Sequence, residues 1–238
     1  MDKLLVALDV DGAPRALQLA AELDGLVGGV KVGSRLFTLE GPALVRRLGD
    51  AGHRVFLDLK FHDIPNQVAQ AVESAVHTGA WIINVHASGG MPMMQAAAGS
   101  GRETAARLGR PAPMLIAVTV LTSMDQQALR QVGVERPMLD HVLALARLAR
   151  EAGLDGVVAS PLETAAIRRE CGPDFTIVTP GIRGASATTA RKDDQARTMG
   201  PADAIRAGAS YIVVGRPIIA APDPRAAAEA IAGELAAI

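Results

Sequence analysis

Two carboxylates and one ammonium lie close together in the segment Asp58-Leu59-Lys60-Phe61-His62-Asp63. An apolar run at residues 55–57 precedes this segment and predicts a buried strand whose carboxyl end opens into a site. Side chains two positions apart share one face of a strand, so Asp58 and Lys60 are expected to point the same way. Charged groups buried at a strand end are costly unless they are paired, which indicates a functional arrangement.

A second lysine, Lys31, stands alone in another apolar run, and its simplest interpretation is an ion pair with Asp9 or Asp58. With this lysine included, four charged residues alternate in sign, namely Lys31, Asp58, Lys60 and Asp63. Opposite charges favour the ionised form of each neighbour in a dry pocket. An ammonium held in this way can deliver a proton to a carbanion, and a carboxylate can repel a substrate carboxylate. This chemistry requires no metal. Mg²⁺ at Asp9, Asp58 and Asp63 is an alternative, but the two interleaved lysines would compete with it.

Short runs rich in Val, Ile and Leu recur along the chain and predict strands that are buried on both faces. They cover residues 4–8, 29–32, 55–59, 81–85, 114–118, 156–159, 175–178 and 211–214. Segments of helical period separate most of them, among them residues 14–23, 67–77, 139–152, 162–169 and 224–236. Eight strand–helix units in 238 residues predict an α/β fold, a single (β/α)8 TIM barrel that spans residues 1–238 as one catalytic domain. An open doubly wound sheet is the alternative, but the first run lacks a following Gly-x-Gly-x-x-Gly turn.

Polar side chains gather at the predicted carboxyl ends of these strands, and the opposite rim has no such concentration. The residues concerned are Asp9, Lys31, Asp58, Lys60, Asn84, His86, Thr119, Thr122, Arg183 and Arg216. Each has an ordinary explanation by itself, such as a helix cap for Asp9 or a buried core position for His86. It is improbable that all of these residues would gather at the same end of the strands by chance. Two long connections, at residues 121–137 and 181–200, would lie on the same face, where barrels build their active sites.

The loops after the seventh and eighth strands of such a barrel often form a phosphate site. Here Gly181, Gly184 and Gly215 would let backbone N–H groups approach an anion closely. Arg183 and Arg216 can donate forked hydrogen bonds to phosphate oxygens, and the ordinary alternative is a pair of surface arginines. This combination predicts a phosphorylated small molecule as the ligand.

The charge balance argues against several other classes of ligand. The chain has 24 Lys and Arg against 25 Asp and Glu, so it lacks the basic excess typical of nucleic-acid binding. No apolar stretch approaches the roughly 20 residues of a membrane helix, and the amino-terminal apolar run is too short for a signal peptide. Cys171 is the only cysteine, which excludes an intrachain disulfide and fits a cytoplasmic setting.

The sequence resembles orotidine 5′-phosphate decarboxylase nearly from end to end. The similar motifs are Ala7-Leu8-Asp9, Val30-Lys31-Val32-Gly33, the stretch from Phe56 to Pro65, Asn84-Val85-His86-Ala87-Ser88-Gly89-Gly90, Thr119-Val120-Leu121-Thr122-Ser123, Thr179-Pro180-Gly181-Ile182-Arg183, Asp194-Gln195-Ala196-Arg197 and Val213-Val214-Gly215-Arg216-Pro217-Ile218. The Asp-x-Lys-x-x-Asp core is shared with sugar-phosphate enzymes. Its continuation into Ile64-Pro65, together with Thr-Pro-Gly-Ile-Arg and Val-Gly-Arg, is much more specific.

The resemblance implies the conversion of orotidine 5′-phosphate to UMP and CO2, the last step of de novo pyrimidine synthesis, with no metal and no cofactor. It implies that Lys60 donates the proton to C6 of the pyrimidine and that Asp58 lies beside the departing carboxylate. Lys31 and Asp63 would complete the charge network. The family pattern also implies a homodimer, in which Asp63 reaches into the site of the neighbouring subunit.

The same resemblance implies a set of substrate-binding residues: Asp9, Lys31, Asp58, Ile64, Thr122, Pro180, Arg183, Gln195, Gly215 and Arg216. Asp9 and Lys31 would hold the ribose hydroxyls, and Thr122 would contact the pyrimidine edge. Gln195, on a closing loop, would bridge phosphate and base. The two arginines and the Gly215 backbone would hold the phosphate.

Two other functions remain open at this stage. A related Mg²⁺-dependent sugar-phosphate decarboxylase or aldolase would place its metal at the same acidic cluster, and it would lose turnover in EDTA. A nucleotide-binding barrel without activity would bind UMP but release no CO2 from orotidine 5′-phosphate. Ile64-Pro65 after the core, with Thr122 and Gln195, favours the metal-independent decarboxylase.

Overall fold

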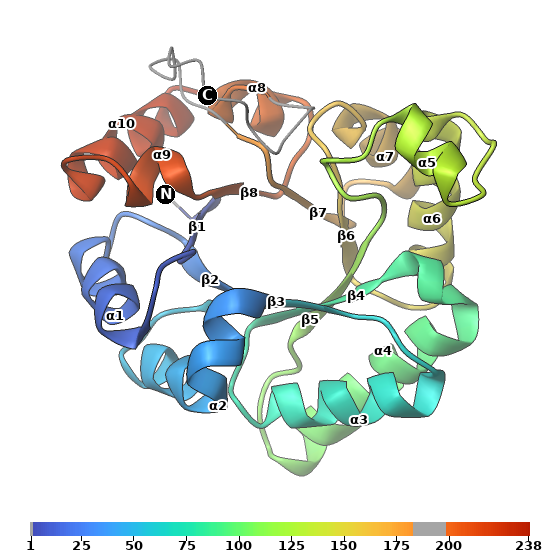
Figure 1. Ribbon diagram of the computed structural model, residues 1–238, viewed down its shortest axis with the longest axis horizontal. Coiled ribbons are helices and arrows are strands. Elements are labelled where there is room, and N and C mark those ends of the chain that lie inside the picture. Colours follow the sequence, from blue (N-terminus) through green and yellow to red (C-terminus); the bar gives the residue numbers. More distant parts are fainter. Residues whose placement is uncertain (1, 183–198) are drawn as a thin grey trace.

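The computed structural model describes residues 2–182 and 199–238, and the strands within them form one closed parallel barrel in chain order (Figure 1). The strands are β1 (Leu4–Ala7), β2 (Gly29–Gly33), β3 (Val55–Phe61), β4 (Ile82–His86), β5 (Met114–Val118), β6 (Gly156–Val158), β7 (Thr176–Thr179) and β8 (Tyr211–Val214). β8 pairs in parallel with β1, which closes the ring. The predicted (β/α)8 barrel is confirmed, and the open sheet is excluded.

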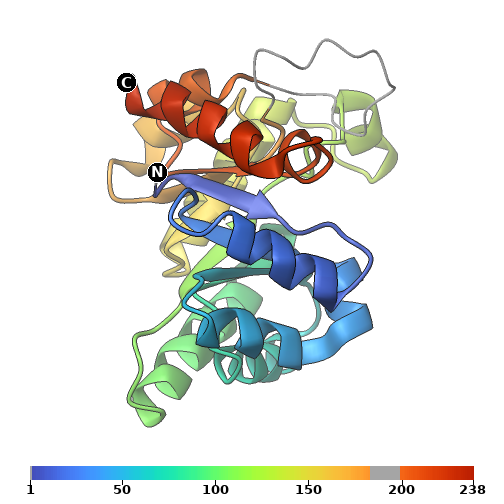
Figure 2. The ribbon, with the colours of Figure 1, turned by 90° about the vertical axis from the view of Figure 1, so that its left-hand side faces the viewer.

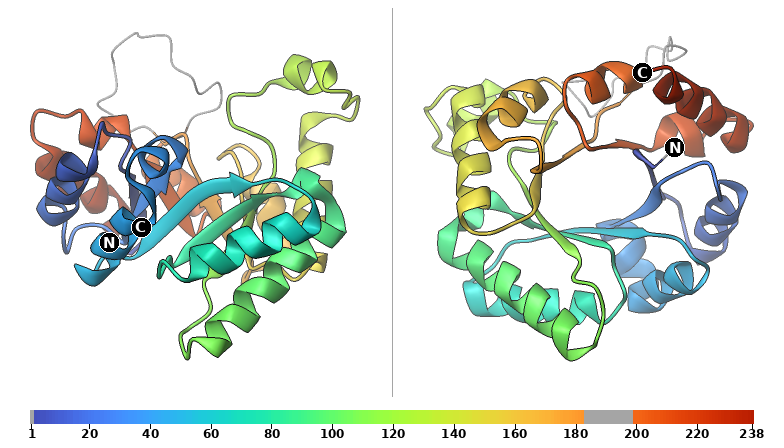
Figure 3. Two further views of the ribbon diagram at one scale, coloured as in Figure 1. Left: turned by 60° about the horizontal axis from the view of Figure 1, so that its bottom comes forward. Right: turned by 180° about the vertical axis from the view of Figure 1, so that it is seen from behind.

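Helices form a ring outside the barrel (Figures 1 and 3). The longer ones are α1 (Ala13–Glu22), α2 (Ser34–Asp50), α3 (Pro65–Val76), α4 (Gly90–Arg107), α6 (Met138–Glu151), α7 (Thr164–Cys171) and α10 (Pro224–Ala236). Shorter helical segments are η1 (Ala87–Gly89), α5 (Gln126–Gln131), α8 (Pro201–Arg206) and α9 (Arg216–Ile219). Figure 2 shows β1 between α1 and α10, so the first and last helices are neighbours in the ring.

The core has two layers because alternate strand residues face opposite sides of the barrel wall. In β1, Leu5 belongs to the cluster inside the barrel, whereas Leu4 belongs to the layer between barrel and helices. At the amino-terminal end of the barrel, Trp81 and Tyr211 pack edge to face with ring centroids 5.2 Å apart, and the Arg54 guanidinium lies 4.4 Å from the Trp81 ring. Apolar and aromatic packing therefore fills the lower barrel, which leaves the carboxyl ends of the strands for polar groups.

The connection after β5 differs from the long loop expected at residues 121–137, because it contains the helix α5. The Asp125 carboxylate accepts a hydrogen bond from Ala128 N at 2.8 Å and caps the start of this helix. The Gln126 side chain accepts from Met138 N and donates to the Arg136 carbonyl, which fastens α5 to the start of α6. The left view of Figure 3 shows α5 standing out from the barrel. The other long connection, at 181–200, falls mostly outside the described residues.

Candidate active site

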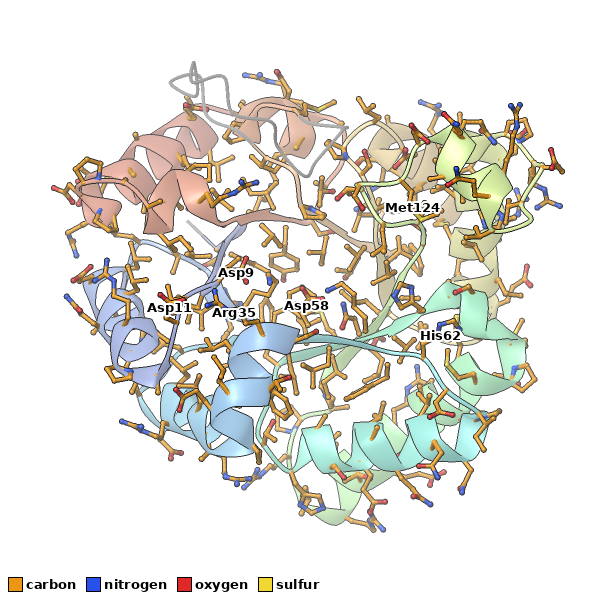
Figure 4. The ribbon with its side chains drawn as sticks, in the orientation of Figure 1. Asp9, Asp11, Arg35, Asp58, His62 and Met124 are labelled. Carbon is orange, nitrogen blue, oxygen red and sulfur yellow. The ribbon has the colours of Figure 1, made fainter. Side chains whose placement is uncertain are left out.

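Asp58 lies at the centre of a network of charges at the carboxyl end of the barrel (Figure 4). Its Oδ1 atom is 2.7 Å from Lys60 Nζ, and its Oδ2 atom is 3.2 Å from Lys31 Nζ. Lys31 Nζ also donates to Asp9 Oδ1 at 3.4 Å. Lys31 comes from β2, Asp58 and Lys60 come from β3, and Asp9 lies two residues beyond the end of β1, so the register of three neighbouring strands brings them together. Lys31 therefore pairs with both of the aspartates that the sequence offered as alternatives.

Ion pairing keeps these groups charged although they are largely buried. Burial alone would raise the pKa of the Asp58 carboxyl, but Lys31 and Lys60 hold it below its usual value. Burial alone would lower the pKa of Lys31, but Asp58 and Asp9 raise it above its usual value. Gly33 leaves room for this arrangement, since a Cβ atom there would lie 3.1 Å from Lys31 Nζ. The site thus holds ammonium and carboxylate groups side by side, with Asp58 and Lys31 largely buried and Asp9 and Lys60 partly exposed at the barrel mouth.

Lys60 departs from the regular strand that the sequence predicted. Its φ of 54° is positive, and it is the only non-glycine residue among the described ones with this left-handed conformation. β3 pairs Leu57 with Ile83 but then Phe61 with Val85, so its carboxyl end carries extra residues relative to β4. Backbone strain of this kind costs on the order of 1–3 kcal/mol and is concentrated at functional sites. The irregularity still leaves Lys60 Nζ in contact with Asp58.

This strain leads to a stability prediction for two variants that both lack the ammonium. We expect Lys60→Gly to be more stable than Lys60→Ala by about 1 kcal/mol, because glycine adopts positive φ without a steric penalty. In a regular strand the order would be the reverse, since glycine weakens strand interiors. Chemical denaturation of both purified variants measures the difference. A more stable alanine variant would mean that position 60 is not left-handed in solution.

The site also contains a residue to which sequence reasoning gave no role. Asn84, on β4, is fully buried, and its Nδ2 atom donates to Asp58 Oδ1 at 2.7 Å. Its Oδ1 atom accepts from Lys60 N at 2.8 Å. The sequence held one sign of it, since Asn84 is an amide within an apolar run that precedes His86. Its hydrogen-bond partners could not be predicted, because they depend on the register between β3 and β4.

Two histidines lie beside this network at the ends of β3 and β4. The ring of His86 is half-buried, with its centroid 5.4 Å from that of the exposed His62. Burial, His62 and Lys60 lower the pKa of His86, and Asp58 opposes them more weakly. His86 is therefore a rim residue kept neutral near pH 7, and not the core histidine of the ordinary interpretation.

Asp63 lies apart from the other three charges. It is exposed in the segment between β3 and α3, and its Oδ1 atom accepts from Ile64 N at 2.7 Å. Within the described ranges Asp63 forms no ion pair with Lys31 or Lys60, and Ile64 is 63% exposed. A single chain therefore does not assemble the four-charge network expected from the sequence.

The structure describes part of the phosphate site that was predicted in the loops after β7 and β8. Gly181, just after β7, has a φ of 82°, a conformation that favours glycine, and Pro180 before it is half-buried. Gly215 accepts from Ile218 N at 2.9 Å at the start of α9, and Arg216, the first residue of that helix, is exposed. A Cβ on Gly215 would lie 3.7 Å from Asp9 Oδ2, so the end of β8 adjoins the charge network.

Three expected residues, Arg183, Gly184 and Gln195, lie outside the described residues. Thr122 is described; it is half-buried in the turn between β5 and α5. Across 2–182 and 199–238, the structure contains no group of three or more His, Cys, Asp or Glu side chains arranged to hold a metal ion. In the same part of the chain, no helix combines the length and apolarity needed to cross a membrane.

The closed parallel barrel and the charge network at its carboxyl end define the protein as a (β/α)8-barrel enzyme, because barrels of this kind carry their chemistry on that face. A family model described as "Orotidine 5'-phosphate decarboxylase / HUMPS family" matches residues 2–231. The chain belongs to this family.

Named relatives agree with the family assignment. The chain is 57% identical over 235 residues to the orotidine 5′-phosphate decarboxylase of Moorella thermoacetica, covering 98% of this chain and 92% of that protein. It is 52% identical to the same enzyme of Syntrophotalea carbinolica, covering 99% of this chain and 95% of the relative. The crystal structure of orotidine 5′-phosphate decarboxylase from Lactobacillus acidophilus superposes with a TM-score of 0.85 at 39% identity, over 98% of each chain.

Proposed function

We propose that this protein decarboxylates orotidine 5′-phosphate to UMP and CO2 as a metal- and cofactor-independent carboxy-lyase. The observation that carries the proposal is Asp58 held between Lys31 and Lys60, in a chain of this family. The relatives at 52–57% identity are named for this reaction. The protein would therefore supply UMP in de novo pyrimidine synthesis.

The reaction needs electrostatic help because no cofactor delocalises the electrons. The bond from C6 to the carboxylate breaks, CO2 leaves, and the electron pair remains on C6. In our proposal, the Lys60 ammonium stabilises this developing carbanion and then transfers a proton to C6. Asp58 faces the departing carboxylate, and its fixed negative charge disfavours the bound substrate relative to the transition state. Lys31 keeps Asp58 ionised throughout.

Substrate contacts are assigned by the same reasoning. Asp9 and Lys31 would hold the ribose hydroxyls, which is supported by their mutual hydrogen bond at the barrel mouth. Arg216 with the Gly215 backbone would hold the phosphate, supported by their place after β8, where barrels commonly bind phosphate. Thr122 would contact the base. Further contacts are proposed for Ile64, Pro180, Arg183 and Gln195.

The metal-dependent alternative conflicts with the chemistry around Asp58. Both of its carboxylate oxygens already face ammonium groups, and Oδ1 also accepts from Asn84. A Mg²⁺ ion would have to displace these donors and would meet two positive charges nearby. We therefore favour the decarboxylase over a Mg²⁺-dependent sugar-phosphate decarboxylase or aldolase.

One assay tests both the reaction and its independence of metal. The purified chain is mixed with orotidine 5′-phosphate, and loss of the orotate absorbance is followed together with release of CO2. We expect the same turnover in excess EDTA as in buffer with Mg²⁺. Turnover that EDTA abolishes and Mg²⁺ restores would favour the metal enzyme, whereas UMP binding without CO2 release would indicate an inactive nucleotide-binding barrel.

We also propose that the protein acts as a homodimer, with residues 1–238 forming one catalytic domain in each subunit. The exposed position of Asp63, away from the charges of its own chain, supports a role in the partner's site. The neighbouring Ile64 is also exposed, and an apolar side chain of this size gains stability when it is covered. The proposed setting is the cytoplasm, where the single thiol, Cys171, stays reduced.

Mixing two inactive variants tests the shared site. Lys60→Ala and Asp63→Ala should each be inactive, because each removes one charge from both sites of its homodimer. A heterodimer would regenerate one intact site, so random subunit exchange should restore about a quarter of the wild-type activity per subunit. If Asp63 served its own chain, the mixture would stay inactive.

A further inference from the structure

The strand ladder between β3 and β4 is interrupted beside the reacting groups. Leu57 pairs with Ile83 and Phe61 pairs with Val85, so residues 58–60 on β3 lie opposite Asn84 alone on β4. The regular one-to-one pairing of β3 with β4 therefore does not continue through these residues. A buried backbone N–H without a partner is costly, and the ladder therefore needs a substitute acceptor at this point.

The Asn84 side chain supplies this acceptor. Lys60 N donates to Asn84 Oδ1 at 2.8 Å, where a regular ladder would provide a backbone carbonyl. The hydrogen-bonding chemistry also fixes the orientation of the amide. The backbone N–H can only donate, so Oδ1 faces Lys60, and the ionised Asp58 can only accept, so Nδ2 faces Asp58.

One buried amide thus joins the two residues that carry the chemistry. It binds the backbone of Lys60 at the single left-handed position among the described non-glycine residues, and it binds the same Asp58 oxygen that lies 2.7 Å from Lys60 Nζ. The Asn84 side chain is fully inaccessible to solvent, so water cannot replace it without opening the barrel wall. Asn84 therefore binds both the backbone that carries the ammonium and the carboxylate that faces it.

We propose that Asn84 is a positioning residue for the decarboxylation. Its amide holds Lys60 in the left-handed conformation and fixes the rotation of the Asp58 carboxylate, so that both charges are in place before the substrate binds. This inference rests on the proposed function of the site. Asn84 does not touch the substrate; it acts through Lys60 and Asp58. Preorganised charges lose much of their catalytic effect when they are misplaced by about 1 Å.

Two variants separate the hydrogen bonds that Asn84 makes. Asn84→Ala removes both of them. Asn84→Asp has nearly the same shape and keeps an oxygen for Lys60 N, but it replaces the donor to Asp58 with a second negative charge. Thr78→Val is the matched control. Thr78 is also buried, and it binds the Ala75 carbonyl just before β4, at the opposite end of that strand.

The readout is the maximal rate kcat of decarboxylation, compared with the affinity for UMP, which lacks the carboxylate. For Asn84→Ala and Asn84→Asp we expect kcat to fall by about 10²-fold or more, with the dissociation constant of UMP within about threefold of wild type. Thr78→Val should keep wild-type kcat. Thermal unfolding of each variant shows that the comparison is made on folded protein, and the near-isosteric Asn84→Asp decides the matter if Asn84→Ala does not fold.

Two results would overturn the inference while the wild type remains active. In the first, a folded Asn84 variant has a kcat within about threefold of wild type, which would mean that Lys60 and Asp58 reach their catalytic positions without Asn84. In the second, UMP affinity falls in parallel with kcat, which would indicate a general structural defect. A wild-type chain that releases no CO2 would instead overturn the proposed function.

Discussion

The Lys60→Ala variant is expected to lose turnover by at least about 10⁴-fold, because in the proposed mechanism one side chain supplies both the proton and the positive charge opposite the carbanion. No described group replaces it. Lys31 Nζ lies between Asp9 and Asp58, and burial, His62 and Lys60 lower the pKa of His86, which disfavours its protonated form. Near-wild-type turnover in this variant would contradict the proposed mechanism.

The same substitution is expected to leave the fold largely intact. The Lys60 side chain is 32% exposed at the mouth of the barrel, so its removal creates no cavity in the core. UMP binding and thermal unfolding of the variant separate a chemical defect from a folding defect. Lys3→Ala, a lysine substitution at an exposed position near the other end of the barrel, should retain full activity.

The barrel could be predicted because each strand–helix unit has the same local sequence pattern, and the pattern recurs along the chain. Strands covered on both faces need continuous apolar runs, and the runs at 114–118 and 211–214 coincide with β5 and β8. The helix α5 could not be predicted in this way. It spans only Gln126–Gln131, and its stability comes from the Asp125 cap and from side-chain bonds to α6, which are contacts specific to this connection.

The part of the site that lies at the end of a single strand, β3, could be predicted from the sequence. Asp58 and Lys60 were expected to share a face, and they are in contact. The left-handed backbone of Lys60 and the two hydrogen bonds of Asn84 were not predictable, because both follow from how β3 and β4 align. Asp63 shows a different limit: in the single chain it lies outside the network, and its proposed partners belong to another molecule.

The phosphate contact proposed for Arg216 leads to the second large expected effect. Arg216→Ala should weaken UMP binding by about 10²-fold, because a charge-assisted hydrogen bond from arginine to phosphate contributes about 1.5–3 kcal/mol. The loss should appear in kcat/KM as well. Although the phosphate is remote from the breaking bond, its binding energy can help to close an active site and to exclude water from it, which lowers the barrier to the reaction.

Uridine provides the discriminating comparison for Arg216→Ala, because it keeps the base and ribose and lacks only the phosphate. If Arg216 holds the phosphate, the variant should bind uridine as the wild type does while its affinity for UMP falls. Arg206→Ala is the matched control, since Arg206 is an exposed arginine on α8 that pairs with Asp203. This control should leave both affinities unchanged. An Arg216→Ala variant with unchanged UMP affinity would show that the phosphate lies elsewhere, and equal losses for uridine and UMP would place Arg216 at the ribose or base.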